Sequence, residues 1–138
     1  MNPGGWVEFQ DYDIMLRGDT SGDNDLLSVQ WATHHVDAAR QIGREPSPGP
    51  RLEHWVKQAG FVNVRHHKFK IPVGDWPKDA KMKLIGAWML ENTLSGLGGF
   101  SLRLFCDVLR WSEDEVHVFL AGVRKQLPQR QFRWYWNW

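Results

Sequence analysis

Four consecutive polar residues near the start of the chain, Gln10, Asp11, Tyr12 and Asp13, carry side chains suited to binding a ligand. They close a strand that is predicted over about residues 5–12. In open α/β sheets, ligands bind outside the carboxyl ends of the strands, so this position favours a ligand-binding cleft. A hydrogen-bonded strand end that binds no ligand is the ordinary alternative for the same residues.

His34 and His35 are the candidate general bases, because imidazole titrates near neutral pH. Both fall in a helix that is predicted from about residue 25 to residue 43. His35 shares one apolar face of this helix with Trp31 and Ala38. A packed, hydrogen-bonded histidine is therefore the alternative that the pattern favours.

The sequence predicts no metal site. His66 and His67 are adjacent on a predicted strand, so they face opposite ways and cannot easily bind one ion. No set of His, Cys, Asp and Glu residues has a recognisable zinc spacing. Cys106 repeats an apolar helical face, which is typical of an inert core residue. These patterns leave the catalytic residues unassigned.

The charge balance gives no reason to expect a polyanionic partner. The chain has 17 Lys and Arg residues against 16 Asp and Glu residues, a formal net charge of +1, so neither nucleic acid nor an anionic membrane is predicted. The basic stretch at 65–70 could contact RNA, but its alternating positions favour a solvated strand face. One cysteine, no signal-peptide pattern and no membrane-spanning apolar run predict an intracellular protein, cytoplasmic or nuclear.

The pattern of elements predicts a single α/β domain over residues 1–138. Besides the strand and the helix above, we expect helices at 50–59, 79–97, 101–109 and 112–127. We expect two further strands, at 61–73 and 130–138. Three glycines between residues 96 and 99 are expected to separate the third and fourth helices. The final strand is apolar on both faces, so we predict that it lies between the other two.

The start of the helix over 112–127 carries the strongest local signal in the chain. Ser112 and Glu115 are spaced three residues apart, as in a capping box, and acidic residues fill the first turn. Pro128 stops the same helix, because proline cannot continue it. Both ends of this helix are therefore predicted from sequence.

Four segments, PGGWVEFQDYD, PGPRLEHWVKQAGFVNV, IPVGDWPKD and LRWSEDEV, together resemble fungal S-adenosylmethionine-dependent methyltransferases. The nearest group is similar to the regulator of fungal secondary metabolism. The resemblance covers almost the whole chain, with the four segments in the right order. It implies a class I, Rossmann-like fold, of which this chain supplies the last three strands, the final one antiparallel and central.

The resemblance also implies methyl transfer from S-adenosylmethionine to a small-molecule or protein acceptor. Gln10, Asp11, Tyr12 and Asp13 would then line the acceptor cleft, and His34 or His35 could act as the base. The family's glycine-rich cofactor turn and its acidic ribose ligand would precede residue 1. We therefore expect that the chain alone binds no cofactor and is inactive by itself.

Two other readings remain open at this point. The chain could be a non-catalytic module that associates with a second copy or a partner through the exposed edge of the first strand. It could also be a truncated gene model. A reading frame upstream of Met1 that encodes a strand and a glycine-rich turn would favour the enzyme.

Overall fold

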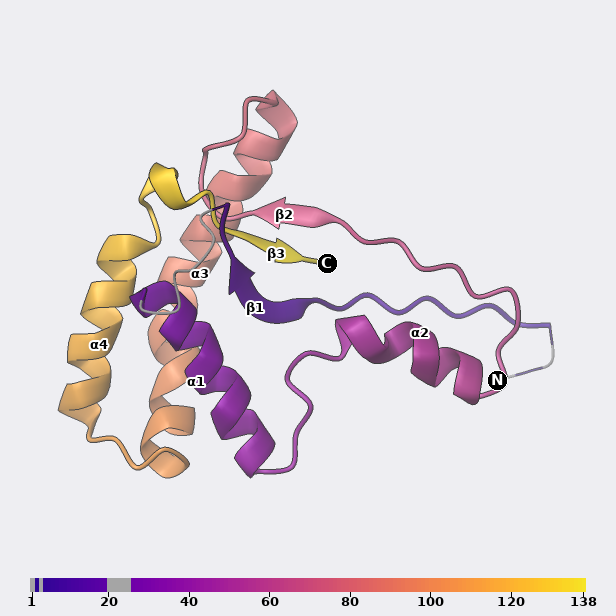
Figure 1. Cartoon of the computed structure of the whole chain (residues 1–138), viewed down its shortest axis with the longest axis horizontal. Coiled ribbons are helices and arrows are strands. Elements are labelled where there is room, and N and C mark those ends of the chain that lie inside the picture. Colours follow the sequence, from indigo (N-terminus) through magenta and orange to yellow (C-terminus); the bar gives the residue numbers. More distant parts are fainter. Residues whose placement is uncertain (1, 3, 20–25) are drawn as a thin grey trace.

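A layer of three helices packs against a small sheet in the computed structural model, which describes residues 2, 4–19 and 26–138 (Figure 1). The expected loop at 17–25 lies partly outside these residues. The expected helix start at residue 25 lies wholly outside them. The elements in chain order are β1 (Asp13–Arg17), α1 (Leu27–Gln41), α2 (Gly49–Gln58), β2 (Lys70–Pro72), α3 (Ala80–Asp107), α4 (Glu113–Gln126), a 3₁₀ turn (Arg130–Phe132) and β3 (Tyr135–Asn137).

The sheet has the order β1-β3-β2, with β3 antiparallel to both neighbours. Asn137 is opposite Asp13 on one side and Lys70 on the other. The two outer strands therefore run parallel to each other and are separated by the last strand of the chain. The predicted central, antiparallel final strand is confirmed, and the described fold is of the α/β class.

All three strands are shorter than predicted, and the first lies elsewhere. The strand expected at 130–138 forms only at Tyr135–Asn137, because residues Arg130–Phe132 make a 3₁₀ turn instead. The strand expected at 5–12 is wrong: β1 begins at Asp13, and the chain before it is extended but unpaired in the described structure. Of the strand expected at 61–73, only Lys70–Pro72 forms. The physical reason is the same on both sides, because β3 provides a neighbouring backbone only as far as Trp138. Side-chain alternation had indicated strand propensity without indicating a partner.

α3 is one continuous helix, so the predicted break between 79–97 and 101–109 is also wrong. Each helical glycine costs about 1 kcal/mol relative to alanine. That cost is offset by packing, because Leu97, Ser101 and Phe105 are buried on the face turned towards α1 and α4. The Trp31 indole N–H also donates to the Ser101 hydroxyl at 2.8 Å. Tertiary contacts thus decide the conformation of the glycine segment.

The core fills the space between the helical layer and the sheet. Its largest fully buried side chains come from α3, α4, the segment after β2 and the aromatic segment before β3: Trp134, Phe105, Leu97, Leu127, Val73, Val116 and Val123. α2 contributes no buried residue and lies apart from this core (Figure 1). Among the described residues, no helix has the length and apolar character needed to cross a membrane.

The predicted capping box at the start of α4 is confirmed. The Glu115 amide donates to the Ser112 hydroxyl at 3.3 Å, and the Glu115 carboxylate accepts from the Ser112 amide at 2.7 Å. These bonds satisfy two amides that the helix itself leaves unpaired.

We expect Ser112→Ala to lower the free energy of unfolding by about 1 kcal/mol, since the capping acceptor is lost. Urea denaturation followed by circular dichroism measures this change. Ser95→Ala is the matched control, because Ser95 is exposed inside α3 and bonds only the Asn92 carbonyl. Equal midpoints for the wild type and Ser112→Ala would contradict the capping role.

Candidate functional site

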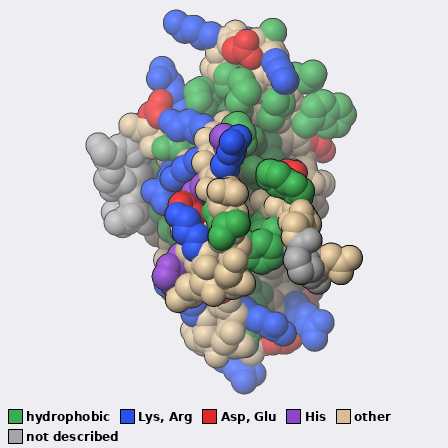
Figure 2. Space-filling view, turned by 90° about the vertical axis from the view of Figure 1, so that its right-hand side faces the viewer, with side chains coloured by type: hydrophobic (Ala, Val, Ile, Leu, Met, Phe, Trp, Pro, Cys, Tyr) green, Lys and Arg blue, Asp and Glu red, His purple; other side chains and the backbone are tan. Residues whose placement is uncertain are grey.

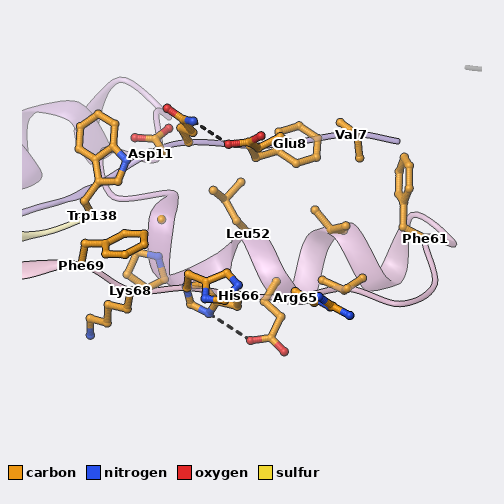
Figure 3. Close-up of a pocket in the computed structure, with 18 of the residues that line it drawn as sticks. Val7, Glu8, Asp11, Leu52, Phe61, Arg65, His66, Lys68, Phe69 and Trp138 are labelled. Carbon is orange, nitrogen blue, oxygen red and sulfur yellow. Dashed lines mark hydrogen bonds and ion pairs between the residues drawn. The ribbon is translucent and has the colours of Figure 1, made fainter. Parts of the chain in front are cut away.

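An elongated groove of about 660 Å³ lies between two extended segments, residues 5–11 and 61–69 (Figure 3). α2 forms its floor with Leu52, Glu53 and Val56. Trp138, at the end of β3, closes one end. Figure 2 faces the side of the molecule towards which the two segments extend, and hydrophobic side chains lie exposed there among Lys and Arg side chains.

Asp13 anchors the groove to the sheet. Its buried carboxylate accepts from the Arg17 guanidinium at 2.8 Å, the Ser47 hydroxyl at 3.0 Å and the Met15 amide at 3.2 Å. Burial alone would raise the pKa of Asp13, but the hydrogen bonds from Arg17, Met15 and Ser47 outweigh it and the pKa is lowered. The carboxylate is therefore ionised, and its bonds tie β1 to the connector that precedes α2.

The other three polar residues of the stretch at 10–13 are Gln10, Asp11 and Tyr12. They lie at the amino end of β1, not at the carboxyl end of a strand as predicted, because β1 begins only at Asp13. Gln10 and Asp11 line the groove. Tyr12 stacks on Trp138, with ring centroids 5.7 Å apart and planes 6° from parallel. Burial, and then the Asp11 carboxylate, raise the pKa of Tyr12, so its phenol stays protonated at neutral pH.

His34 and His35 lie away from the groove, in the helical layer. His35 is buried, with Nδ1 2.8 Å from the Trp31 carbonyl and Nε2 3.2 Å from the Phe100 carbonyl. This is the packed, hydrogen-bonded arrangement that the sequence favoured. His34 packs edge-on against the ring of Trp111, with ring centroids 5.0 Å apart. The structure therefore separates the two histidines from the polar run at Gln10–Asp13.

Burial lowers the pKa of His35, against the opposing effect of its two carbonyl partners, and burial likewise lowers the pKa of His34. The unfolded chain, with histidine pKa values near 6.5, then binds protons that the folded chain does not. The free energy of unfolding should therefore fall as the pH drops from about 7.5 to about 5.5, by at most about 1.4 kcal/mol per pH unit for the buried His35 and by less for His34, where solvent screens the effect.

Urea melts at a series of pH values measure this slope. We expect His35→Gln to flatten it, because the variant removes one of the two groups. His54→Gln is the matched control, since His54 is exposed on α2 and should leave the slope unchanged. A stability that is constant over this pH range would contradict the burial of the two imidazoles.

No glycine that follows a described strand forms a cradle for a cofactor. Gly18 comes after β1, but a Cβ there would meet the Phe132 carbonyl and the ring of Trp134. Gly74 comes after β2, and the backbone of Gly86 lies against it, with Gly74 N donating to Gly86 O at 2.8 Å. The described residues thus offer no glycine cradle after a strand for a nucleoside cofactor, and no step through one is derived. They also hold no cluster of three or more potential metal ligands.

Sequence reasoning missed most of the groove. Its floor and its second wall come from α2 and the segment 61–69, which were assigned only as structural elements. One signal was present: Leu52 and Val56 repeat along one face of a short helix that has no buried residue. An apolar helical face without a place in the core indicates a surface contact.

The comparison with curated proteins finds fungal relatives of this chain. The chain is 39% identical to Methyltransferase pytC of Aspergillus terreus over 127 residues, which are 91% of this chain and 39% of that protein. It is 33% identical to Probable methyltransferase tdiE of Emericella nidulans over 138 residues, 99% of this chain and 43% of that protein. The chain is homologous to fungal methyltransferases.

The homologues also include regulators of secondary metabolism. Secondary metabolism regulator LAE1 of Cochliobolus heterostrophus is 26% identical over 140 residues, 99% of this chain and 46% of the regulator. The chain therefore spans less than half the length of these curated relatives. No protein-family model matches the chain, and no solved structure matches it. The predicted resemblance to fungal methyltransferases and secondary metabolism regulators is confirmed.

Proposed function

We propose that this chain forms part of a domain that transfers a methyl group from S-adenosylmethionine to a small-molecule or protein acceptor. The observation that carries the proposal is the similarity to named methyltransferases over 91% or more of the chain. The sheet order supports a partial class I fold, because β3 is antiparallel and central between two mutually parallel strands.

The proposed role of this chain is on the acceptor side of the domain. S-adenosylmethionine would supply an electrophilic methyl group, and the protein would position the acceptor and keep water away. The groove is lined by Gln10, Asp11 and Asp13, among other residues. The proposal is that these side chains contact an acceptor bound in the groove. His34 and His35 remain proposals as bases, and they would act from the helical layer.

We expect the 138-residue chain to show no saturable binding of S-adenosylmethionine at micromolar concentration, because its described residues form no glycine-rich cradle. Isothermal titration calorimetry measures the binding. A chimera that joins the segment of pytC preceding its matched region to this chain should bind the cofactor. Binding by the chain itself would show that the cofactor site has been misplaced.

The same chimera tests the methyltransferase proposal. With labelled S-adenosylmethionine and an extract of Aspergillus terreus as the source of acceptors, it should transfer label as the parent pytC does. A folded chimera that binds the cofactor but transfers no label, while pytC does so under the same conditions, would contradict the proposal.

A non-catalytic interaction module is the second candidate function. The observation that favours it is the groove itself, which is flanked by two extended segments without backbone partners in the described structure. Association with a partner chain at this part of the molecule would cover them. An interaction module requires no cofactor. A chain without methyltransferase activity would therefore agree with this second candidate function.

A further inference from the structure

The first half of α3 extends beyond the core of the molecule. Between residues 80 and 92 only Gly86 is buried, whereas four residues of the second half reach the core. Figure 1 shows this first half rising past the sheet, and Figure 2 shows hydrophobic side chains exposed at the same end of the molecule. One face of a long helix therefore has no partner in the described structure.

Two large apolar side chains stand at the centre of this face. Leu84 is 60% exposed and Trp88 is 68% exposed. They are four residues apart, about one helical turn, so their side chains are neighbours on the helix surface. Large apolar side chains that adjoin one another on a surface indicate an interaction site, whereas isolated ones do not.

Residues of opposite charge flank this apolar pair. Lys81 precedes Leu84 by three residues, and Glu91 follows Trp88 by three, so all four residues share one side of the helix. Both charged side chains are exposed, and neither has an ion-pair partner in the part of the chain that the structure describes. Together the four residues form the α3 stripe.

The α3 stripe is complementary to itself when a second copy lies antiparallel. Leu84 and Trp88 are equally far from Gly86 along the helix, and so are Lys81 and Glu91. A twofold axis at the level of Gly86 therefore places Leu84 opposite the partner's Trp88. The same axis places Lys81 opposite the partner's Glu91, and it repeats every contact at the other end.

The charges select this arrangement over its alternatives. In a parallel pair, Lys81 would face the partner's Lys81 and Glu91 would face the partner's Glu91, so both contacts would be repulsive. An antiparallel pair shifted by about one turn would place Lys81 opposite the partner's Ser95 or the partner's Ala87, and the ion pairs would be lost. One register alone satisfies both the apolar and the charged residues.

The size of the contact fits a dimer that dissociates readily. A single helix from each copy buries no more than the lower end of the area found in specific complexes, about 1,200 Å². Trp88 supplies the large aromatic anchor on which small interfaces depend. Exposed ion pairs add little affinity, but they fix orientation and register.

We propose that two copies of this chain associate through the α3 stripe as an antiparallel pair of helices. The two Trp88 rings form the apolar centre, and Lys81 pairs with the partner's Glu91 at both ends. The stripe shares no residue with the groove, so the dimer goes beyond the proposed methyl transfer and does not depend on it.

Sedimentation velocity of the full chain, from about 1 μM to about 500 μM, should show a monomer that converts to a dimer. Trp88→Ala should raise the dissociation constant at least about tenfold, because it removes the aromatic anchor. Phe100→Ala is the matched control on the same helix, since Phe100 is 53% exposed but lies outside the stripe, and it should dimerise like the wild type. Circular dichroism checks that both variants are folded.

Charge reversal tests the register. At about 0.05 M salt, where screening is weak, Lys81→Glu and Glu91→Lys should each weaken the dimer at least about threefold, because each creates like charges at both ends. The double variant should regain the wild-type dissociation constant. Lys83→Glu is the control for net charge, since Lys83 is exposed about 100° around the helix from Leu84, and it should have no such effect.

Four results would overturn the proposal. A chain that stays monomeric at about 500 μM has no such interface. A dimer that Trp88→Ala leaves unchanged forms elsewhere on the molecule. A double charge variant as weak as the two single variants excludes the antiparallel register. The chimera with the preceding segment of pytC should dimerise as well, and a monomeric chimera would mean that the stripe is covered within a longer chain.

Discussion

Replacing Phe105 with alanine should lower the free energy of unfolding by about 3–5 kcal/mol, the usual cost of truncating a fully buried phenylalanine. Phe105 is 0% exposed and sits where three helices meet. Its ring centroid lies 4.8 Å from that of His35 and 5.4 Å from that of Trp111. Because these neighbours are held by their own bonds and packing, they cannot close over the cavity.

Urea denaturation followed by circular dichroism measures the loss as a lower midpoint with an unchanged slope. Total stabilities of domains are about 5–15 kcal/mol, so Phe105→Ala should leave only a marginal fold. Phe100→Ala is the matched control on the same helix, because the Phe100 side chain is 53% exposed, and it should cost less than about 1 kcal/mol. Similar losses for the two variants would contradict the central position of Phe105.

Gly86→Ala should destabilise the protein by about 2–3 kcal/mol, although alanine is the better helix former. A Cβ at residue 86 would overlap the carbonyl oxygen of Gly74 and would lie 3.0 Å from its carbonyl carbon. Both obstacles are backbone atoms, so no side-chain rotation relieves the overlap. α3 would have to move away from the end of β2, and the hydrogen bond from Gly74 N to Gly86 O would be lost.

Gly99→Ala tests the same substitution where there is room. Gly99 lies on the same helix and no atom lies within 4 Å of its added Cβ. Here the higher helix propensity of alanine should raise stability by up to about 1 kcal/mol. The two variants are thus expected to shift the melting temperature in opposite directions. A stabilising Gly86→Ala would show that α3 and β2 are farther apart than the structure has them.

Local signals in the sequence predicted the parts of the fold that local interactions decide. The capping box at Ser112 and Glu115 is complete within four residues, and its bonds form as expected. The aromatic run before Trp138 indicated a strand buried on both faces, and such a strand needs a neighbour on each side. α1 and α2 also begin and end within a few residues of their predicted limits.

Where the sequence failed, a distant segment decided the outcome. The alternating residues of 5–12 favour a strand, but a strand forms only beside a partner, and β3 does not reach them. The glycines of α3 favour a break, but the burial of Leu97 and Phe105 holds the helix together. The groove needs α2 and 61–69 to lie beside 5–11, a juxtaposition that no local pattern contains.

The position of β3 has a consequence for synthesis of the protein in the cell. β1 and β2 do not pair with each other, and every ladder bond of the described sheet involves β3, which is translated after both of them. On the ribosome, helices can form as they emerge, but the sheet must wait until residues 134–138 have left the exit channel. A premature stop codon just before Tyr135 would therefore abolish the whole sheet and would leave both outer strands as substrates for proteases.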